Sequence, residues 1–362
     1  MNTPTRKESS SRIPVVVLGA TGSVGQRFVQ LLDGHPWFEV VALTGSERTT
    51  GQTYAEACHW VVPVPMPAWA AGMPVLPSEP DSLSSGPAPR LAFSALPTQQ
   101  ARLIEPTFAQ AGLAVCSNAS AYRDEPDVPI LLPEVNPDHT GIIATQRRQR
   151  GWAGCIVTNS NCTSTGLTVA LKALQDAFGL RRLFVVSMQA VSGAGYPGVP
   201  SLDIIDNVIP YIGGEEVKVE SEPRKMLGRF TGDALEDARF SISAHTNRVA
   251  VTDGHLVCAS VELDHPVSVE EAAQALRAYA APAVSRHLPS APLPVIVVKD
   301  EPDRPQPRLD RQAGDGMATV VGRLRPDPLF HLKMVVLSHN TIRGAAGGSI
   351  YNAELLVETG YL

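Results

Sequence analysis

The sequence predicts an α/β protein with two domains, the first of them built on a mostly parallel sheet. Short apolar runs alternate with helical or loop segments through about residue 155, and this alternation is typical of parallel sheets. A glycine-rich turn follows the first apolar run directly. The chain has 362 residues, enough for two domains that each bury a core. Hydrophobic residues make up 44% and charged residues 18%, an ordinary balance for a globular protein.

The first element is a strand at residues 14–18, followed by a glycine turn and a helix. Gly19, Gly22 and Gly25 have the spacing GxxGxxG, and helix-patterned residues follow from Phe28 to Leu32. In this variant of the dinucleotide-binding turn, the backbone approaches a pyrophosphate that lies on the helix N-terminus. The pattern therefore predicts a dinucleotide cofactor.

The second predicted strand, residues 38–43, carries information about which dinucleotide is bound. Sites that prefer NAD usually have an acidic residue at the tip of this strand, whereas NADP sites offer hydroxyls and an arginine to the 2′-phosphate. Ser46 and Arg48 fit NADP, and Glu47 between them must then point away from the ribose. Arg48 taken alone is equally compatible with a solvated loop cation.

The remaining elements follow in chain order. Further strands of the first half are expected at residues 91–95, 113–116 and 154–158. Residues 61–90 are rich in proline and are expected to form an irregular surface excursion. The second half is expected to contain strands at 181–191 and 256–263, a helix at 269–281 that begins after Ser268, and a strand pair near 294–298 and 317–323. A closing helix is expected at 349–359.

Cys162 is a candidate nucleophile because it lies between the apolar segment that ends near residue 158 and a helical run. At a helix start, free backbone N–H groups and the helix dipole lower a thiol pKa, and the same N–H groups can hold an oxyanion. A buried structural cysteine is the alternative, since free cysteines are usually core residues.

Bulk properties exclude several other classes of protein. The formal charge is −6 without a basic stripe, so nucleic-acid binding is not expected, and the partners should be small molecules. No apolar run is long enough to span a membrane, and the polar first twelve residues do not look like a signal peptide. The five cysteines lack CxxC spacing, which argues against a disulfide framework and against a zinc site. We therefore expect no metal and a reducing, cytoplasmic location.

Motifs along almost the whole chain resemble those of the aspartate-β-semialdehyde dehydrogenase family, in particular its fungal and archaeal branch. They are GATGSVG at 19–25, Ser-Glu-Arg at 46–48, Ser-Asn-Ala at 117–119, Pro-Glu-Val-Asn at 133–136, Ser-Asn-Cys-Thr at 160–163, the run from Asn247 to His255, and the run from Asn340 to Gly347.

The resemblance implies a fold and a reaction. It implies a Rossmann-type NADP-binding domain at 1–158, an α+β catalytic and dimerisation domain of the glyceraldehyde-3-phosphate dehydrogenase-like type at 159–338, and a C-terminal helix at 339–362 that returns to the first domain. It also implies a phosphate-dependent interconversion of L-aspartyl-4-phosphate and L-aspartate 4-semialdehyde with NADPH, through a cysteine thioester. This step leads toward lysine, methionine and threonine, and the enzyme would be a homodimer or homotetramer.

The resemblance also implies roles for individual residues. Cys162 would be the nucleophile, His255 the acid/base, Gln189 a group that orients the substrate, and Arg248 the fork for the substrate α-carboxylate. The other expected substrate contacts are Asn161, Glu222, Lys225, Arg123 and Asn118. The expected cofactor contacts are Gly19, Thr21, Gly22, Ser23, Val24, Gly25, Ser46, Arg48, Ser94, Ser192, Gly193, Asn340 and Thr341.

Glu222 and Lys225 resemble the family's Glu-x-x-Lys pair, in which the acid binds the substrate ammonium and the lysine binds phosphate. The same spacing also makes an ordinary intrahelical salt bridge. Pro223 departs from the family pattern and implies that Glu222 lies at the start of a helix.

Two other functions remain open from the sequence. A sister reductase on the same scaffold, acting on malonyl-CoA or N-acetylglutamyl phosphate, would share the cysteine and the histidine but would not need a carboxylate for an ammonium. A catalytically silent NADP-binding protein is disfavoured, because Cys162, Gln189, Arg248 and His255 all occur in one chain.

Overall fold

The N-terminal part of the chain forms a six-stranded parallel sheet in the computed structural model, which describes residues 12–84 and 86–362. The strands are β1 (Ile13–Leu18), β2 (Phe38–Gly45), β3 (Val75–Pro77), β4 (Leu91–Ser94), β5 (Ala114–Ser117) and β6 (Cys155–Thr158). Their order is β3-β2-β1-β4-β5-β6, which reverses direction between β1 and β4. In such sheets ligands bind at the carboxyl ends of the strands beside this reversal.

Helices cover both faces of this first sheet. They include α1 (Ser23–Leu31), α4 (Thr98–Gln110) and α5 (Ile143–Arg150), with shorter turns α2 (Tyr54–Ala57), η1 (Pro80–Leu83) and η2 (Pro137–Ile142). Alternate residues of β1 point to opposite faces, so Val15 and Val17 join one apolar cluster while Val16 and Leu18 join another. Burial on both faces explains why this strand is a continuous apolar run in the sequence.

Residues 61–90 are more ordered than the sequence predicted. They contain the short helix α3 (Ala68–Ala71) and the strand β3, which pairs with β2 from Leu43↔Val75 to Gly45↔Pro77. β3 is an edge strand, and an edge position tolerates proline because one side of the strand needs no hydrogen-bond partner. The prediction of a wholly irregular segment was therefore wrong.

The second half of the chain builds a mixed sheet in the order β10-β7-β11-β14-β13-β12. Its strands are β7 (Arg182–Gln189), β10 (Ser241–Arg248), β11 (His255–Glu262), β12 (Ile296–Lys299), β13 (Thr319–Pro326) and β14 (Leu332–Ser338). A separate hairpin pairs β8 (Arg229–Phe230) with β9 (Leu235–Glu236). The predicted mixed α/β fold class, with a first domain built on a parallel sheet and a second domain built on a mixed sheet, is confirmed.

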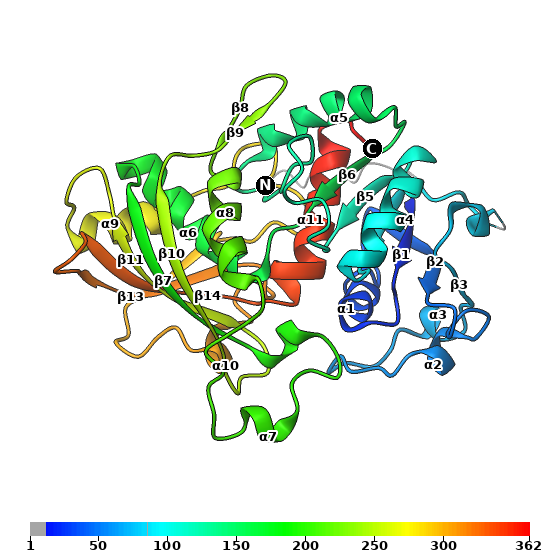
Figure 1. The fold of residues 1–362 in the computed structure, drawn as a ribbon, viewed down its shortest axis with the longest axis horizontal. Coiled ribbons are helices and arrows are strands. Elements are labelled where there is room, and N and C mark those ends of the chain that lie inside the picture. Colours follow the sequence, from blue (N-terminus) through cyan, green and yellow to red (C-terminus); the bar gives the residue numbers. More distant parts are fainter. Residues whose placement is uncertain (1–11, 85) are drawn as a thin grey trace, which may run out of the picture.

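Three helices pack on one face of the second sheet, as Figure 1 shows: α6 (Cys162–Phe178), α8 (Glu215–Met226) and α9 (Val269–Ala278). Shorter helical turns are η3 (Val191–Ala194), α7 (Ser201–Ile204) and α10 (Pro307–Asp310). In β7 the buried residues alternate with more exposed ones, among them Phe184 and Val186. The other face of the sheet is therefore open in the single chain.

The start of α8 corrects one prediction. Glu222 was expected at a helix start because proline follows it, but α8 begins seven residues earlier at Glu215 and keeps Pro223 inside its last turns. A proline can occupy this place at the cost of one backbone hydrogen bond. Glu222 therefore lies on the body of a helix that packs against α6.

The C-terminal helix α11 (Gly347–Glu358) returns to the first sheet, and Figure 1 shows it in red between the two sheets. Ile350, Ala353 and Leu356 join the apolar cluster that contains Val15 and Phe93. The preceding turn, η4 (Ile342–Ala346), is anchored by a fully buried ion pair between Arg343 and Glu134, whose N and O atoms are 2.6 Å apart. Among the described residues, no helix is both long enough and apolar enough to cross a membrane.

Candidate active site

Cys162 is the first residue of α6, directly after the turn that follows β6. Asn161 caps the helix, and its side-chain oxygen accepts hydrogen bonds from the backbone N–H groups of Thr163 at 2.9 Å and Ser164 at 3.2 Å. The sequence suggested that these two N–H groups could bind an oxyanion. They are not free to do so, because the side chain of Asn161 already accepts from both of them. Within the described part of the chain, the N–H of Cys162 itself has no acceptor.

The charge state of Cys162 also differs from the expectation. Burial raises the pKa of its thiol to about 12, and the carboxylates of Glu215 and Glu222 act in the same direction. Arg123 and Arg248 oppose this effect without outweighing it. The predicted lowering by the helix N-terminus is therefore wrong for the ligand-free chain, because the sulfur loses hydration among buried groups.

His255 lies at the start of β11 and is held in one tautomer. The backbone N–H of Ala190 donates to its Nδ1 at 3.1 Å, so the proton of the neutral ring is on Nε2. Burial lowers the pKa of the imidazole to about 3, with help from the nearby Arg248. Contrary to the expectation of titration near neutral pH, this ring is neutral. Its Nε2–H has no partner among the described residues and is available as a hydrogen-bond donor.

Arg248 and Gln189 end two neighbouring parallel strands and face each other in register. One guanidinium nitrogen of Arg248 donates to the carbonyl oxygen of Ala190 at 2.7 Å, which fixes the arginine beside His255. Gly193 lies in front of both groups, because a Cβ there would be 2.8 Å from Arg248 Nη1 and 3.1 Å from His255 Nε2. Any side chain at position 193 would therefore fill the space before these two groups.

A cavity of about 610 Å³ brings most of the predicted catalytic and substrate residues together. Its walls include Ser23, Val24, Asn118, Arg123, Asn161, Cys162, Gln189, Ser192, Gly193, Arg248, Asn340 and Thr341. Gly344 also lines it, and a Cβ at this position would be 2.7 Å from Cβ of Cys162. Gly344 belongs to the motif from Asn340 to Gly347, but its importance comes from this close approach, which no local pattern indicates.

Glu222 and Lys225, which the resemblance implied as substrate contacts, do not line this cavity. Glu222 is only 3% exposed and is bonded to Arg123 and to the backbone of Asn161. Lys225 donates to two backbone carbonyls, and burial lowers the pKa of its ammonium to about 8.

Glu215 and Lys218 occupy the cavity wall instead. They have the same Glu-x-x-Lys spacing two helical turns earlier on α8, and their charged atoms are 3.6 Å apart. Asn161 Nδ2 donates to Glu215 at 2.8 Å, which ties this acid to the nucleophile turn. The sequence contained both pairs, so the repeated spacing was the signal that could have revealed the second one.

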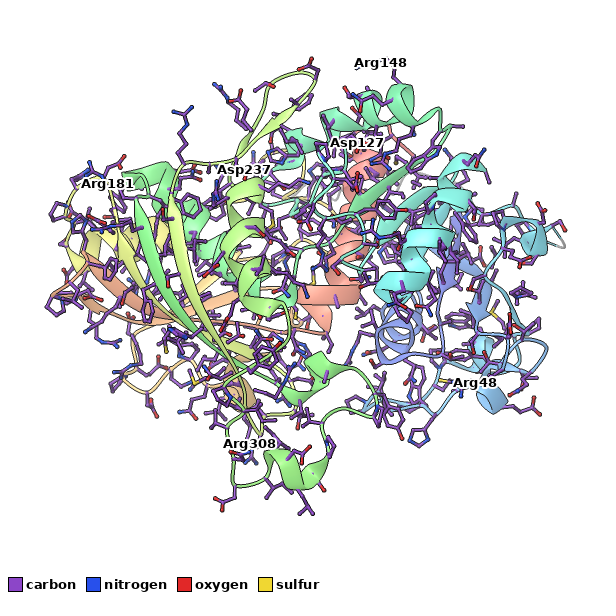
Figure 2. All side chains as sticks on the ribbon, in the orientation of Figure 1. Arg48, Asp127, Arg148, Arg181, Asp237 and Arg308 are labelled. Carbon is purple, nitrogen blue, oxygen red and sulfur yellow. The ribbon has the colours of Figure 1, made fainter. Side chains whose placement is uncertain are left out.

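A second cavity, of about 690 Å³, contains the predicted cofactor contacts of the first domain. Its walls include Gly19, Thr21, Gly22, Ser46 and Arg48, and Figure 2 shows Arg48 at the outer side of this domain. Leu96 and Pro97 line both cavities, so the two spaces adjoin. Glu47 also lines this cavity rather than turning away from it.

Two predicted cofactor contacts are absent from the cavity walls. Gly25 packs against the first strand turn, where a Cβ would lie 2.3 Å from the carbonyl oxygen of Gly19, so its role is close helix–strand packing. Ser94 is fully buried at the end of β4, and its carbonyl oxygen accepts a hydrogen bond from Asn118. No cluster of three or more metal-binding side chains occurs within residues 12–84 and 86–362.

The family described as "Semialdehyde dehydrogenase, NAD binding domain" matches residues 14–142, and that described as "Semialdehyde dehydrogenase, dimerisation domain" matches residues 171–343. The aspartate-semialdehyde dehydrogenase of Archaeoglobus fulgidus is 53% identical over 96% of this chain and 98% of its own. The enzyme of Schizosaccharomyces pombe is 46% identical over 96% and 99%.

Solved structures of aspartate semialdehyde dehydrogenases are also similar to this chain. The aspartate semialdehyde dehydrogenase of Candida albicans with NADP has a TM-score of 0.88 and 42% identity, covering 97% of this chain and 100% of that one. Aspartate semialdehyde dehydrogenase II of Vibrio cholerae, complexed with ASA, has a TM-score of 0.75 and 25% identity, covering 96% and 99%.

Proposed function

Because the chain belongs to the aspartate-semialdehyde dehydrogenase family, whose members are oxidoreductases, we propose that it interconverts L-aspartyl-4-phosphate and L-aspartate 4-semialdehyde with NADPH and inorganic phosphate. The fungal and archaeal relatives are the branch that the sequence motifs predicted. The observation that carries the proposal is one cavity in which a nucleophile, an arginine fork, an acid and two further cations converge.

The charged groups of the cavity complement an aspartyl substrate. Arg248 suits the α-carboxylate, because a guanidinium offers two parallel N–H donors. Glu215 suits the ammonium, and Lys218 and Arg123 suit the phosphate. In this proposal Glu215 and Lys218 take the roles that the sequence gave to Glu222 and Lys225, since only Glu215 and Lys218 line the cavity.

The covalent step takes place at Cys162. The sulfur attacks the carbonyl carbon of the acyl phosphate, the thiol proton passes to a phosphate oxygen as the C–O bond to phosphate breaks, and a thioester remains on the enzyme. The substrate's own carbonyl oxygen becomes negatively charged during this attack. The free N–H of Cys162 and the Nε2–H of His255 are the donors proposed to stabilise that charge, and Gly193 keeps the space in front of His255 open.

The cofactor cavity fits NADP. Gly19 has a left-handed φ of 70°, and the helix N-cap at Gly22 has no side chain to fill the phosphate cradle. Ser46 and Arg48 supply a hydroxyl and a cation where a 2′-phosphate would lie. When bound, NADP supplies the hydride acceptor or donor for the substrate carbonyl carbon. Ser192, Asn340 and Thr341 line the cavity that contains Cys162, and Asn340 donates to the hydroxyl of Ser192 at 2.8 Å.

Replacing Arg48 by alanine should raise the KM for NADP about tenfold or more while leaving that for NAD nearly unchanged. A hydrogen bond to a charged group is worth about 1.5–3 kcal/mol, and only NADP has the 2′-phosphate that Arg48 contacts. Steady-state kinetics with both cofactors measure this. Equal increases in KM for NADP and NAD would show that Arg48 supports the loop and does not bind the 2′-phosphate.

A second copy of the chain is the proposed protein partner. The open face of the second sheet carries the exposed alternate residues of β7 and β10, and the segment from Tyr196 to Val217 exposes several large apolar side chains. Several large exposed apolar side chains on one segment are typical of an interface. We infer a homodimer formed through the domain whose family description is dimerisation. The choice between dimer and tetramer and the cytoplasmic location stay predictions.

The substrate is tested by Glu215→Gln on two aldehydes. Aspartate semialdehyde carries an ammonium, whereas succinate semialdehyde lacks it and is otherwise the same. The variant should lose about 10- to 100-fold in kcat/KM for the aspartate aldehyde and much less for the des-amino aldehyde, because only the former brings a charge to be paired. Glu216→Gln is the control, because this neighbouring acid accepts a backbone hydrogen bond from Thr246 outside the cavity.

Phosphate-dependent reduction of NADP by the unmodified enzyme completes this test. Oxidation of aspartate semialdehyde that requires inorganic phosphate supports the proposal. If malonate semialdehyde with CoA is the better substrate, or if Glu215→Gln weakens both aldehydes equally, the sister-reductase alternative replaces it. The relatives reported above do not favour that alternative.

A further inference from the structure

Glu105, on α4, is a fully buried acid that the proposed mechanism does not use. The hydroxyl of Ser117, the last residue of β5, donates to Glu105 Oε1 at 2.6 Å. The same hydroxyl accepts a hydrogen bond from the backbone N–H of Ala119 at 3.1 Å. Among the described residues, the other carboxyl oxygen of Glu105, Oε2, has no hydrogen-bond partner. Half of a buried acid is thus unpaired, which is uncommon in folded proteins.

Ser94 is a second unpaired group beside this acid. It is fully buried at the end of β4 and pairs in register with Ser117 on β5. Its hydroxyl lies close enough to the Glu105 carboxyl to lower the pKa of that group, yet it has no hydrogen-bond partner within the described residues. Neither serine lines the cofactor cavity or the substrate cavity, so ligand contacts do not account for them.

The loop of residues 117–123 forms one wall of the substrate cavity. Four of its residues line that cavity: Asn118, Ala119, Ser120 and Arg123. Arg123 Nη2 donates to the carbonyl oxygen of Asn118 at 2.8 Å, so the start of the loop sets the place of the guanidinium. α4 also holds the middle of the loop, because Arg102 donates to the carbonyl oxygen of Ala121 at 2.7 Å.

We propose that Glu105 is a positioning residue: by hydrogen bonds and not by charge, it fixes the start of the 117–123 loop and thereby holds Arg123 where the phosphate binds. The inference rests on the proposed function in assigning phosphate to Arg123. Cys162 and His255 lie on other elements, α6 and β11. Glu105 therefore acts on phosphate binding and not on the covalent step.

An uncharged carboxyl explains the unpaired groups. Burial raises the pKa of Glu105 to about 7, although Ser117, Ser94 and Arg123 oppose this effect. The titratable groups that face it from outside α4 are Arg123 and Tyr122, both in the same loop. A protonated Glu105 can accept from Ser117 with one oxygen and donate to Ser94 with the other. The amide of glutamine offers the same acceptor and a donor in the same place, whereas leucine offers neither.

Glu105→Leu should raise the dissociation constant for inorganic phosphate about tenfold or more, because the buried hydroxyl of Ser117 loses its acceptor and the loop shifts. Calorimetric titration with phosphate measures this without aldehyde or turnover. The enzyme is first saturated with NADP, so that phosphate cannot occupy the place of the 2′-phosphate. The affinity for NADP should change much less, whereas a general loosening of the first domain would weaken NADP binding as well.

Thr107→Val is the matched control on the same helix. Thr107 is exposed, and its hydroxyl donates only to the carbonyl oxygen of Ile104 within α4. This variant should bind phosphate like the wild type. Ser117→Ala should weaken phosphate binding as Glu105→Leu does. In the Ser117→Ala background, Glu105→Leu should have little further effect, because the donor that Glu105 holds is already gone.

Glu105→Gln distinguishes hydrogen bonding from charge. It should bind phosphate like the wild type, because both hydrogen bonds persist. The folded wild type keeps the Glu105 proton up to about pH 7, whereas the unfolded chain releases it near the ordinary value of 4.5. The wild type therefore loses stability as the pH rises between these values. Glutamine does not ionise, so the Tm of Glu105→Gln relative to that of the wild type should be higher at pH 8 than at pH 5.

Three results would overturn the proposal. The first is wild-type phosphate affinity in Glu105→Leu, or in Ser117→Ala if the leucine variant does not fold. The second is an equal loss of phosphate affinity in Glu105→Gln and Glu105→Leu, which would show that the charge is required. The third is a Tm difference that is the same at both pH values. A wild-type enzyme that binds phosphate but does not oxidise aspartate semialdehyde contradicts the proposed function alone, and one that binds no phosphate contradicts both.

Discussion

Cys162→Ala should abolish aldehyde oxidation, with a loss of roughly 10⁴-fold or more, while NADPH binding persists. Alanine removes the only atom that forms the proposed thioester. The cofactor contacts around Gly19 and Arg48 lie in the adjoining cavity and are untouched. Steady-state rates and NADPH fluorescence titration measure the two properties separately.

Cys162→Ser is the companion variant. It should keep at most a trace of activity, because a serine hydroxyl oxygen without an adjacent base is a much weaker nucleophile toward an acyl carbon than cysteine sulfur. Cys258→Ser, on the second sheet and outside both cavities, is the control for the loss of a thiol. Near-normal turnover of either Cys162 variant would remove the covalent mechanism.

The first elements of the chain could be predicted because the residue patterns that indicate them lie close together in the sequence. The strand, glycine turn and helix around Gly19 follow one another within twenty residues, and the position of Cys162 at a helix start follows from the apolar run before it. β3 was missed because an edge strand of three residues between prolines has no periodicity of its own. Its order comes from pairing with β2, a tertiary contact.

The choice between two acid–lysine pairs on α8 could not be made from spacing. Glu215 and Glu222 are seven residues apart, which is close to two helical turns, so both point to the same side of the helix. Only the position of each residue along the axis of α8 decides which of them reaches the cavity. This position relative to the cavity depends on how α8 packs against α6.

The charge states of the catalytic groups could likewise not be predicted from the sequence. A thiol at a helix start predicts a low pKa, and an isolated imidazole predicts titration near neutral pH. In the folded chain, loss of hydration dominates both groups: it raises the pKa of the Cys162 thiol and lowers that of the His255 imidazole. Burial of this kind is a property of the packed structure and leaves no local trace in the residue pattern.

The neutral tautomer of His255 leads to the second large expected effect. His255→Ala should lower kcat by about 10²- to 10³-fold, the usual loss when one donor to a developing oxyanion is removed. Because Ala190 N–H occupies Nδ1, the ring presents Nε2–H toward Gly193, next to Arg248. His255→Gln can still offer an N–H from its amide, so it should keep clearly more activity than the alanine variant.

The pH dependence of kcat separates a donor from a titrating base. With a pKa of about 3, His255 is uncharged at any pH above about 4, so kcat of the wild type should show no ionisation between pH 6 and 7. Protonation would appear only as the pH falls toward 3, where the imidazolium forms beside Arg248. A wild-type ionisation near pH 6.5 that both variants lack, together with equal losses for alanine and glutamine, would instead make His255 the proton carrier of the reaction. Unequal losses and a flat profile identify it as a fixed donor to the substrate oxygen.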